Sequence, residues 1–352
     1  MAARSRQTDP TKEAYLANIT HRLVHANGIR IHVAEAGPQD GPCVIMCHGF
    51  PESWYSWRHQ LHALGDAGYH AVAPDMRGMG RSSRPLDPNQ YAQPKLVGDV
   101  VGLLAELDHD TAVIAGHDWG APVAWNAALM RPDLFPAVIG LSVPFYGART
   151  TFTSDHTVPP SVAMRRETGD GFHYQLYFNE VGRAEADLER DVRKWLGGFF
   201  FTASGDAPPE EITLDKLVRG DKLEDAFAWP KTLPSWLTED DLDVYAADYE
   251  RTGFASALNY YRAADATWYE MAPFRGASIT VPACFVAGDH DLVIAMNREI
   301  YDGMPSEVPD LRTNLLLPGC GHWTQQERPD ETNAAMLKFL ADVAARPSGP
   351  QS

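Results

Sequence analysis

Short, continuously apolar runs recur along the chain and alternate with segments whose apolar residues are spaced for one face of a helix. Runs of this kind are typical of strands that are buried on both faces of a sheet. They occupy residues 43–47, 70–74, 111–116, 137–143, 282–288 and 314–319. Helical spacing is found at residues 57–64, 97–104, 121–129 and 332–345. In the last of these segments, Leu337 and Leu340 are predicted to face inward. The alternation predicts an α/β fold with a mainly parallel sheet and helices on both of its faces.

Two stretches depart from this alternation. Near the amino terminus, HRLVHANG and IRIHVAEAG alternate apolar and polar residues around Asn27-Gly28, which predicts a β-hairpin. Between about residues 148 and 270 the strand signals stop, and aromatic, charged and helix-forming residues are broken by prolines. We therefore predict a sheet domain that is interrupted by a helical lid. The predicted parts are the core at 19–147 and 270–345, the lid at 148–269, and flexible tails at 1–18 and 346–352.

The strongest local signal is GHDWGA, which follows the apolar run TAVIA and opens a helical segment. Glycines at both outer positions, Gly116 and Gly120, are typical of the sharp strand-to-helix turn called a nucleophile elbow. The usual pattern there is G-x-S-x-G, but Asp118 occupies the central position in this chain. A helix N-cap aspartate is the alternative interpretation.

An aspartate in that position changes the chemistry that the site supports. A serine that attacks an sp3 carbon gives an ether, which cannot be hydrolysed further, whereas a carboxylate gives an ester. Water and a base can hydrolyse that ester at its carbonyl group. Asp118 is therefore suited to substrates that are opened by displacement at carbon, such as epoxides and alkyl halides.

Two further loops complete the predicted site. HGFP follows the run CVIMC and is expected to supply the backbone N–H of Phe50 to an oxyanion hole, together with that of Trp119. His48 in the same loop is expected to be structural. GCGHW presents His322 after the last apolar run, where a general base belongs, and AGDHDLV offers Asp289 or Asp291 to orient it.

The overall composition argues against several other classes of function. The net charge of -17 leaves no basic stripe for nucleic acid, and no apolar run approaches the length of a membrane span. The first residues have no apolar segment typical of a secretory signal. The four cysteines, Cys43, Cys47, Cys284 and Cys320, lack the spacing of metal ligands and are expected to be buried in a reducing cytoplasm. No credible metal cluster is predicted.

Other polar positions are interpreted as structural. The loop at residues 75–82 is rich in glycine but has neither the lysine nor the spacing of a phosphate-binding loop. Asp99 is predicted to lie on a helix surface. His21, His25 and His32 lie near the first two strands, away from the carboxyl ends of the parallel strands, where sites in α/β folds form.

Several segments together resemble the epoxide hydrolases of the α/β-hydrolase superfamily. The resemblance extends from about residue 20 to residue 345. The segments are HGFPESWYSWRHQ, DMRGMGRSS, GHDWGAPVAW, FHYQLYFNEVG, LNYYR and GHWTQQERP. It implies Asp118 as nucleophile, His322 as the base that activates water, and Asp291 as the charge-relay acid, with Asp289 as the alternative. It implies no cofactor or metal, a small-molecule epoxide and water as substrates, and a possible homodimer.

The resemblance also implies two lid tyrosines that hydrogen-bond the epoxide oxygen and protonate it. They correspond to Tyr174 and Tyr261, and the alternatives are the neighbouring Tyr177 and Tyr260. The family motif more often reads NWYR, so Tyr260 replaces a tryptophan. The expected product is a vicinal diol. The competing interpretations are a haloalkane dehalogenase, which has no such tyrosine pair, and a non-catalytic receptor with the same fold.

Overall fold

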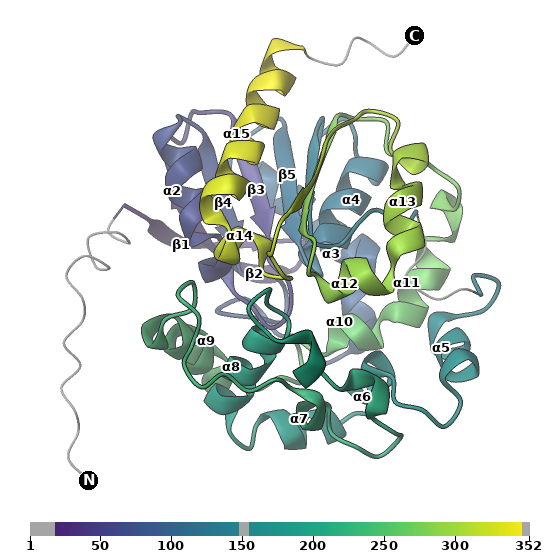
Figure 1. Cartoon of the computed structure of the whole chain (residues 1–352). Helices are drawn as coiled ribbons and strands as arrows, with labels where there is room; N and C mark the ends of the chain where they lie inside the picture. Colours follow the sequence, from purple (N-terminus) through teal and green to yellow (C-terminus); the bar gives the residue numbers. More distant parts are fainter. Residues whose placement is uncertain (1–17, 148–154, 347–352) are drawn as a thin grey trace.

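The computed structural model describes residues 18–147 and 155–346, and its centre is an eight-stranded sheet (Figure 1). The strands follow the order β1-β2-β4-β3-β5-β6-β7-β8 across the sheet. Strand β2 is antiparallel to β1 and β4, and all pairs from β4–β3 to β7–β8 are parallel. The strand bounds are β1 (Thr20–Ala26), β2 (Ile29–Ala36), β3 (Cys43–Cys47), β4 (His70–Pro74), β5 (Ala112–His117), β6 (Val138–Leu141), β7 (Ala283–Gly288) and β8 (Leu311–Leu317). The predicted fold class, including the mainly parallel sheet, is confirmed.

The predicted hairpin joins β1 to β2. Ala26 pairs with Ile29 across a two-residue turn, and Asn27 and Gly28 have φ angles of 50° and 76°. Two successive positive φ angles define the type I′ turn, which matches the twist of antiparallel strands and favours Asn-Gly. The hairpin prediction is therefore confirmed.

Helices cover both faces of the sheet, so the central strands are buried throughout. Helices α2 (Arg58–Asp66) and α15 (Pro329–Ala345) pack together on one face, and α3 (Gln93–Glu106) and α4 (Gly120–Met130) pack together on the other (Figure 1). The part of the sheet domain that follows the lid in sequence also contains α12 (Leu292–Met296), α13 (Arg298–Glu307) and α14 (Thr324–Glu327).

The inward face of α15 differs slightly from the prediction. Leu340 is buried as expected, but Leu337 is only partly buried. Met336 and Phe339 are buried instead. The buried face of the helix is therefore centred about one residue away from the predicted face.

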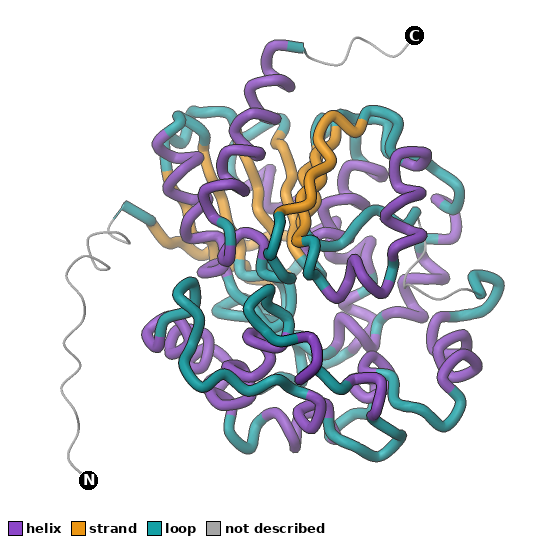
Figure 2. The backbone as a smooth tube through the Cα atoms, in the orientation of Figure 1, coloured by secondary structure: helices purple, strands orange, loops and turns teal. Residues whose placement is uncertain are grey.

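A layer of helices and loops lies against one edge of the sheet, as the teal and green segments of Figure 1 and the purple and teal tube of Figure 2 show. Its helices are α5 (Pro160–Thr168), α6 (Tyr174–Asn179), α7 (Arg183–Leu188), α8 (Val192–Thr202), α9 (Glu239–Thr252), α10 (Asn259–Arg262) and α11 (Ala264–Glu270). Within the part of this layer that the structure describes, extended pairing is limited to an isolated bridge between Gly171 and Val218. The exact division between core and lid stays a prediction. Residues 148–154, and most of the predicted tails, lie outside the described residues.

Asp99 does not lie on a helix surface, so that prediction is wrong. Its side chain is 5% exposed and accepts hydrogen bonds from Arg77 Nε at 2.8 Å and from Asn27 Nδ2 at 2.8 Å. The hairpin turn and the loop after β4 fold over this face of α3, and the periodicity of a single helix cannot reveal such a cover. Among the described helices, none combines the length and apolar character that a membrane crossing requires.

Candidate active site

Asp118 lies at the tip of the turn between β5 and α4. Its φ angle is 49°, which is rare for a residue with a side chain and is typical of functional turns. The flanking glycines are required by close packing: a Cβ on Gly116 would lie 2.0 Å from the Gly120 carbonyl oxygen, and one on Gly120 would lie 2.1 Å from that of Cys47. The turn therefore projects the Asp118 carboxylate beyond the sheet, where it remains 17% exposed.

The HGFP loop after β3 lies directly against this carboxylate. The backbone N–H of Phe50 donates to Asp118 Oδ1 at 2.7 Å. A Cβ at Gly49 would lie 2.2 Å from the same oxygen, so only glycine allows the loop to approach so closely. The carboxylate oxygen Oδ1 is thus fixed, and Oδ2 faces the rest of the site. His48 points away: its Nδ1 lies 2.9 Å from the Gly49 carbonyl, and its Nε2 accepts from the Met76 N–H at 2.9 Å, as expected of a structural residue.

His322 and Asp291 meet Asp118 from the ends of β8 and β7. His322 Nε2 lies 3.4 Å from Asp118 Oδ2, and its Nδ1 lies 3.2 Å from Asp291 Oδ1. Asp291 is fully buried and also accepts from the Val293 N–H at 2.8 Å, because it caps the start of α12. Asp289 is exposed and accepts from the Gly319 N–H at 2.7 Å, so it does not orient the histidine.

These charges control one another's protonation. Burial by itself opposes ionisation of Asp118, but His322 and the Phe50 N–H lower the pKa of this carboxyl below its usual value. Burial likewise opposes the charged form of His322, but Asp291 and Asp118 raise the pKa of the imidazole well above its usual value. The free site therefore favours the charged forms of Asp118 and His322 together.

Tyr174 and Tyr261 come from α6 and α10 of the lid, and both lie within reach of the Asp118 charge. Their rings are 6.1 Å apart, and the Tyr261 ring packs edge-on against Trp119 at 5.0 Å. Burial raises the pKa of Tyr174 to about 12 and that of Tyr261 well above its usual value, and the Asp118 charge adds to both shifts. Gln175 Nε2 donates to the Tyr174 oxygen at 3.0 Å, which leaves the Tyr174 proton available to another acceptor. Both phenols are therefore protonated hydrogen-bond donors.

The alternative tyrosines make other contacts. Tyr177 donates to Asp187 Oδ2 at 2.9 Å, and Tyr260 donates to the Arg77 carbonyl at 3.0 Å. Each hydroxyl proton is thus held by a partner of its own.

Sequence reasoning missed Ser142, which follows β6 and has a φ angle of 68°. Its hydroxyl lies 2.7 Å from His322 Nδ1 and donates to Asp291 Oδ2. A serine inside an apolar run was the available signal, but it indicates no partner.

A buried ion pair beneath His322 was also missed. Glu52 and His117 are both fully buried, and Glu52 Oε2 lies 2.9 Å from His117 Nδ1. His117 Nε2 lies 2.7 Å from the His322 carbonyl oxygen, which can only accept. Because a carboxylate and a carbonyl face its two nitrogens, His117 carries both protons and is a cation. The pair holds the backbone of the GCGHW loop. The sequence held two signals for this ion pair: the glutamate directly after HGFP and the histidine inside GHDWG.

Comparison with known proteins agrees with this geometry. Residues 42–329 match the family described as alpha/beta hydrolase fold. The chain is 43% identical to epoxide hydrolase A of Mycobacterium tuberculosis over 339 residues, covering 93% of this chain and 99% of the relative. It is 42% identical to an epoxide hydrolase of Caballeronia sordidicola, covering 92% and 94%.

Solved structures give the same result. An epoxide hydrolase from an endophytic Streptomyces superposes with a TM-score of 0.87 at 44% identity, covering 93% of this chain and 97% of that one. Epoxide hydrolase A from Mycobacterium thermoresistibile superposes with a TM-score of 0.84 at 41% identity, covering 92% and 98%. With an aspartate at its nucleophile elbow and relatives of this identity over nearly its whole length, the chain belongs to the epoxide hydrolases of the α/β-hydrolase fold.

Proposed function

We propose that this chain converts an epoxide and water into a vicinal diol through a covalent ester on Asp118. The observation that carries the proposal is the arrangement around one carboxylate. Asp118 Oδ1 is held by the Phe50 N–H, Oδ2 faces His322, and two protonated tyrosines of the lid lie close enough for the Asp118 charge to raise their pKa values.

In the first step, Asp118 Oδ2 attacks a ring carbon and the carbon–oxygen bond of the epoxide breaks. Tyr174 and Tyr261 donate hydrogen bonds to the departing oxygen, and one of them transfers its proton. Because burial keeps both phenols protonated, they supply these bonds across the neutral pH range. The product of this step is a hydroxyalkyl ester.

In the second step, His322 removes a proton from water, and the hydroxide attacks the ester carbonyl. Ester formation has removed the negative charge of Asp118, which in the free site helps to keep His322 protonated. The imidazolium therefore loses its proton more readily at this stage; that proton replaces the one that the tyrosine transferred in the first step, and the neutral imidazole becomes a base. Asp291 orients the ring and stabilises the imidazolium that forms again. The ester bond then breaks, the leaving oxygen takes the proton from His322, the carboxylic acid of Asp118 returns its proton to His322, and the diol departs.

The oxyanion that forms in the second step develops on Oδ1. This oxygen already accepts from the Phe50 N–H in the free site, so the donor requires no rearrangement. The N–H of Trp119, the residue after the nucleophile, is the second donor in the proposal. Donors of this type typically contribute about 10²–10³ in rate.

Diol formation from a panel of aryl and alkyl epoxides tests the activity. Asp118→Ala should abolish turnover, and Tyr174→Phe with Tyr261→Phe should lower kcat strongly. Tyr177→Phe and Tyr260→Phe are the matched controls, because their hydroxyls are bound to other partners, and both should retain activity. Diol formation by the Asp118→Ala protein would refute the mechanism. Halide release from alkyl halides without diol formation would indicate a dehalogenase, and the absence of both activities would favour a receptor.

A single turnover in ¹⁸O-labelled water tests the order of events. The ester mechanism places the label in the Asp118 carboxylate and unlabelled oxygen in the diol, whereas direct attack by water labels the diol. His322→Ala should still form the ester but fail to hydrolyse it, so mass spectrometry should detect the substrate mass on the protein. A His322→Ala protein that binds substrate without gaining mass would contradict the sequence of steps.

The cellular setting is part of the proposal. We propose a cytoplasmic location, which the four free and buried cysteines support, because buried thiols persist in a reducing compartment. We also propose a homodimer, as the family resemblance suggests. Sedimentation velocity at micromolar concentrations tests the assembly, and a monomer at all concentrations would exclude it.

A further inference from the structure

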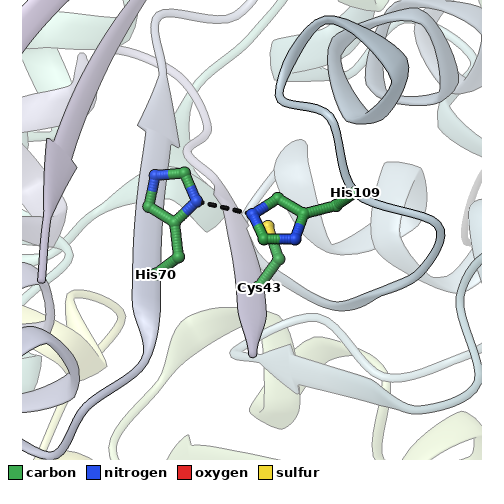
Figure 3. Close-up of side chains that lie close together, drawn as sticks. All are labelled: Cys43, His70 and His109. Atoms are coloured by element: carbon green, nitrogen blue, oxygen red, sulfur yellow. Dashed lines mark hydrogen bonds between the residues drawn. The ribbon is translucent and has the colours of Figure 1, made fainter. Parts of the chain in front are cut away.

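Three side chains that can bind metal ions meet at the edge of the sheet remote from Asp118. Cys43 is the first residue of β3, His70 is the first residue of β4, and His109 lies in the loop between α3 and β5. Cys43 and His70 are register partners in parallel strands, so their side chains project from the same face. Figure 3 shows the two imidazoles facing each other with the thiol beside them. The Cys43 sulfur and one nitrogen of each histidine lie within 4.8 Å of one another.

The outer nitrogens of both rings are occupied by hydrogen-bond acceptors. His70 Nε2 lies 3.1 Å from Glu35 Oε1, and His109 is hydrogen-bonded to the backbone of Gln39, whose carbonyl can only accept. In their neutral forms both rings therefore carry their proton on the outer side. The inner nitrogens, His70 Nδ1 and His109 Nε2, then point lone pairs at each other across 2.8 Å.

Two lone pairs at this distance repel unless a cation lies between or beside them. A proton between the two nitrogens removes the repulsion, but one of the two imidazoles is then positively charged. A proton shared between the two rings is therefore the alternative to a metal ion at this position. A divalent ion satisfies both lone pairs while the two imidazoles remain neutral, which is the state in which histidine binds metals.

The surroundings favour such an ion. Neutral imidazole and thiolate are the preferred ligands of zinc, at roughly 2.0–2.1 Å and 2.3 Å, and a tetrahedral ion needs donor atoms about 3.3–3.7 Å apart. Opening the histidine pair slightly and moving the sulfur inward produces that spacing. Glu35 fixes the ring of His70 in the way that carboxylates hold metal-binding histidines. His109 is only partly buried, which leaves an entry path and a fourth position for water.

We propose that Cys43, His70 and His109 bind one zinc-type divalent ion that joins the starts of β3 and β4 to the loop before β5. The ion is structural, since the catalytic carboxylate lies at the opposite ends of the strands. Binding releases the thiol proton, because the thiolate is the form of cysteine that binds metal ions, so the affinity should increase with pH.

The test uses the full-length, untagged protein after treatment with a chelator. Titration with Co²⁺ should produce a cysteine-to-cobalt charge-transfer band and tetrahedral ligand-field bands that saturate at one ion per chain. Calorimetry with Zn²⁺ should give the same stoichiometry. Cys43→Ser should remove the charge-transfer band, and His109→Ala should weaken Zn²⁺ binding by at least about 10-fold. Glu35→Gln should weaken it by roughly 10–100-fold, since it only loses the group that orients His70.

The controls separate metal binding from folding. Cys284→Ser changes another buried strand cysteine and should leave both titrations unchanged. Diol formation and thermal unfolding of each variant report that the chain is folded, and His109→Ala tests the proposal even if Cys43→Ser does not fold. The proposal is overturned if no one-to-one binding occurs with a Kd at or below about 10 µM. It is equally overturned if Cys43→Ser and His109→Ala bind both metals as tightly as the unchanged chain. In either case the histidine pair shares a proton instead.

Discussion

Replacing Glu52 by glutamine tests whether the buried ion pair beneath the active site stabilises the fold. Glu52 is fully buried, and each carboxylate oxygen accepts from two donors. Oε2 accepts from the Gly49 N–H at 3.0 Å and from His117 Nδ1 at 2.9 Å. Oε1 accepts from the side-chain amides of Gln325 at 3.2 Å and Gln326 at 3.1 Å. A glutamine has the same shape, but one of its two ends only donates.

On each side of the carboxylate, one neighbour cannot reverse its role to accommodate that change. On the Oε1 side, the Gln326 amide is fixed because its own oxygen accepts from Arg58 NH1 at 2.8 Å and from the Tyr245 hydroxyl at 2.8 Å. On the Oε2 side, the backbone N–H of Gly49 can only donate. Every orientation of the new amide therefore places a donor against a donor, and the His117 charge loses its counterion.

The expected loss of unfolding free energy at pH 7 is about 3–5 kcal/mol, the range for breaking a buried ion pair by removing one partner. Urea unfolding monitored by tryptophan fluorescence measures it. With a slope of about 3 kcal/mol/M, the midpoint should fall by at least about 1 M. Glu180→Gln is the control, because its carboxylate is 43% exposed and its pair with Arg183 should contribute less than about 1 kcal/mol.

The pH dependence gives an independent check. Burial opposes ionisation of Glu52, but His117 holds the pKa of this carboxyl below its ordinary value of 4.5. A lowered pKa in the folded state means that the ionised group stabilises the fold above pH 4.5 and loses this effect as the pH falls. The difference between the unchanged chain and Glu52→Gln should therefore shrink below pH 4.5. A difference under 1 kcal/mol at pH 7, or one that is constant down to acid pH, would refute the reasoning.

Three other substitutions probe the geometry of the site. Gly49→Ala places a methyl group 2.2 Å from Asp118 Oδ1, so kcat should fall by about 10²-fold or more, and the overlap should also lower the free energy of unfolding by about 1–3 kcal/mol. Ser142→Ala removes a hydroxyl 2.7 Å from His322 Nδ1, and kcat should fall by about 5–10-fold with a shifted pH profile; an unchanged profile would show that the serine does not position the ring. Asp291→Asn should lower kcat by about 10³–10⁴-fold, whereas Asp289→Asn, on the exposed loop, should retain activity; equal losses in steady-state assays would contradict the assignment of the acid.

Much of the fold and the centre of the site could be predicted because they depend on local sequence. Strands buried on both faces must be continuously apolar, and an Asn-Gly turn must adopt positive φ angles, so both are visible in a short window. The chain order of nucleophile, acid and base is likewise a linear property. Asp118, His322 and an acid at Asp289 or Asp291 could therefore be assigned to strand ends from the sequence, and the family resemblance favoured Asp291.

The remaining features depend on which distant segments meet. Asp99 has the spacing of an exposed helix position and is buried only because the hairpin turn lies over it. Ser142 lies in a run that indicates nothing but a strand. The cluster of Cys43 and two histidines has no motif, because its members come from two strand starts and a loop that are neighbours only in the folded sheet. A short segment of sequence therefore cannot reveal these contacts, because their members are far apart along the chain.

The buried charges at the catalytic edge favour a particular order of chemical steps. Glu52, Asp118 and Asp291 carry three negative charges, which His117 and His322 offset with two positive ones. Groups buried this deeply cost free energy to desolvate, so the arrangement is poorly explained by stability alone. In the proposed mechanism it is explained by reactivity: the excess negative charge resides on Asp118 and disappears when the ester forms. Of the two cations, only the one that faces the ester loses a partner, and it then becomes the base that completes the reaction. The pair of Glu52 and His117 keeps its charges and holds the GCGHW loop in place in both steps.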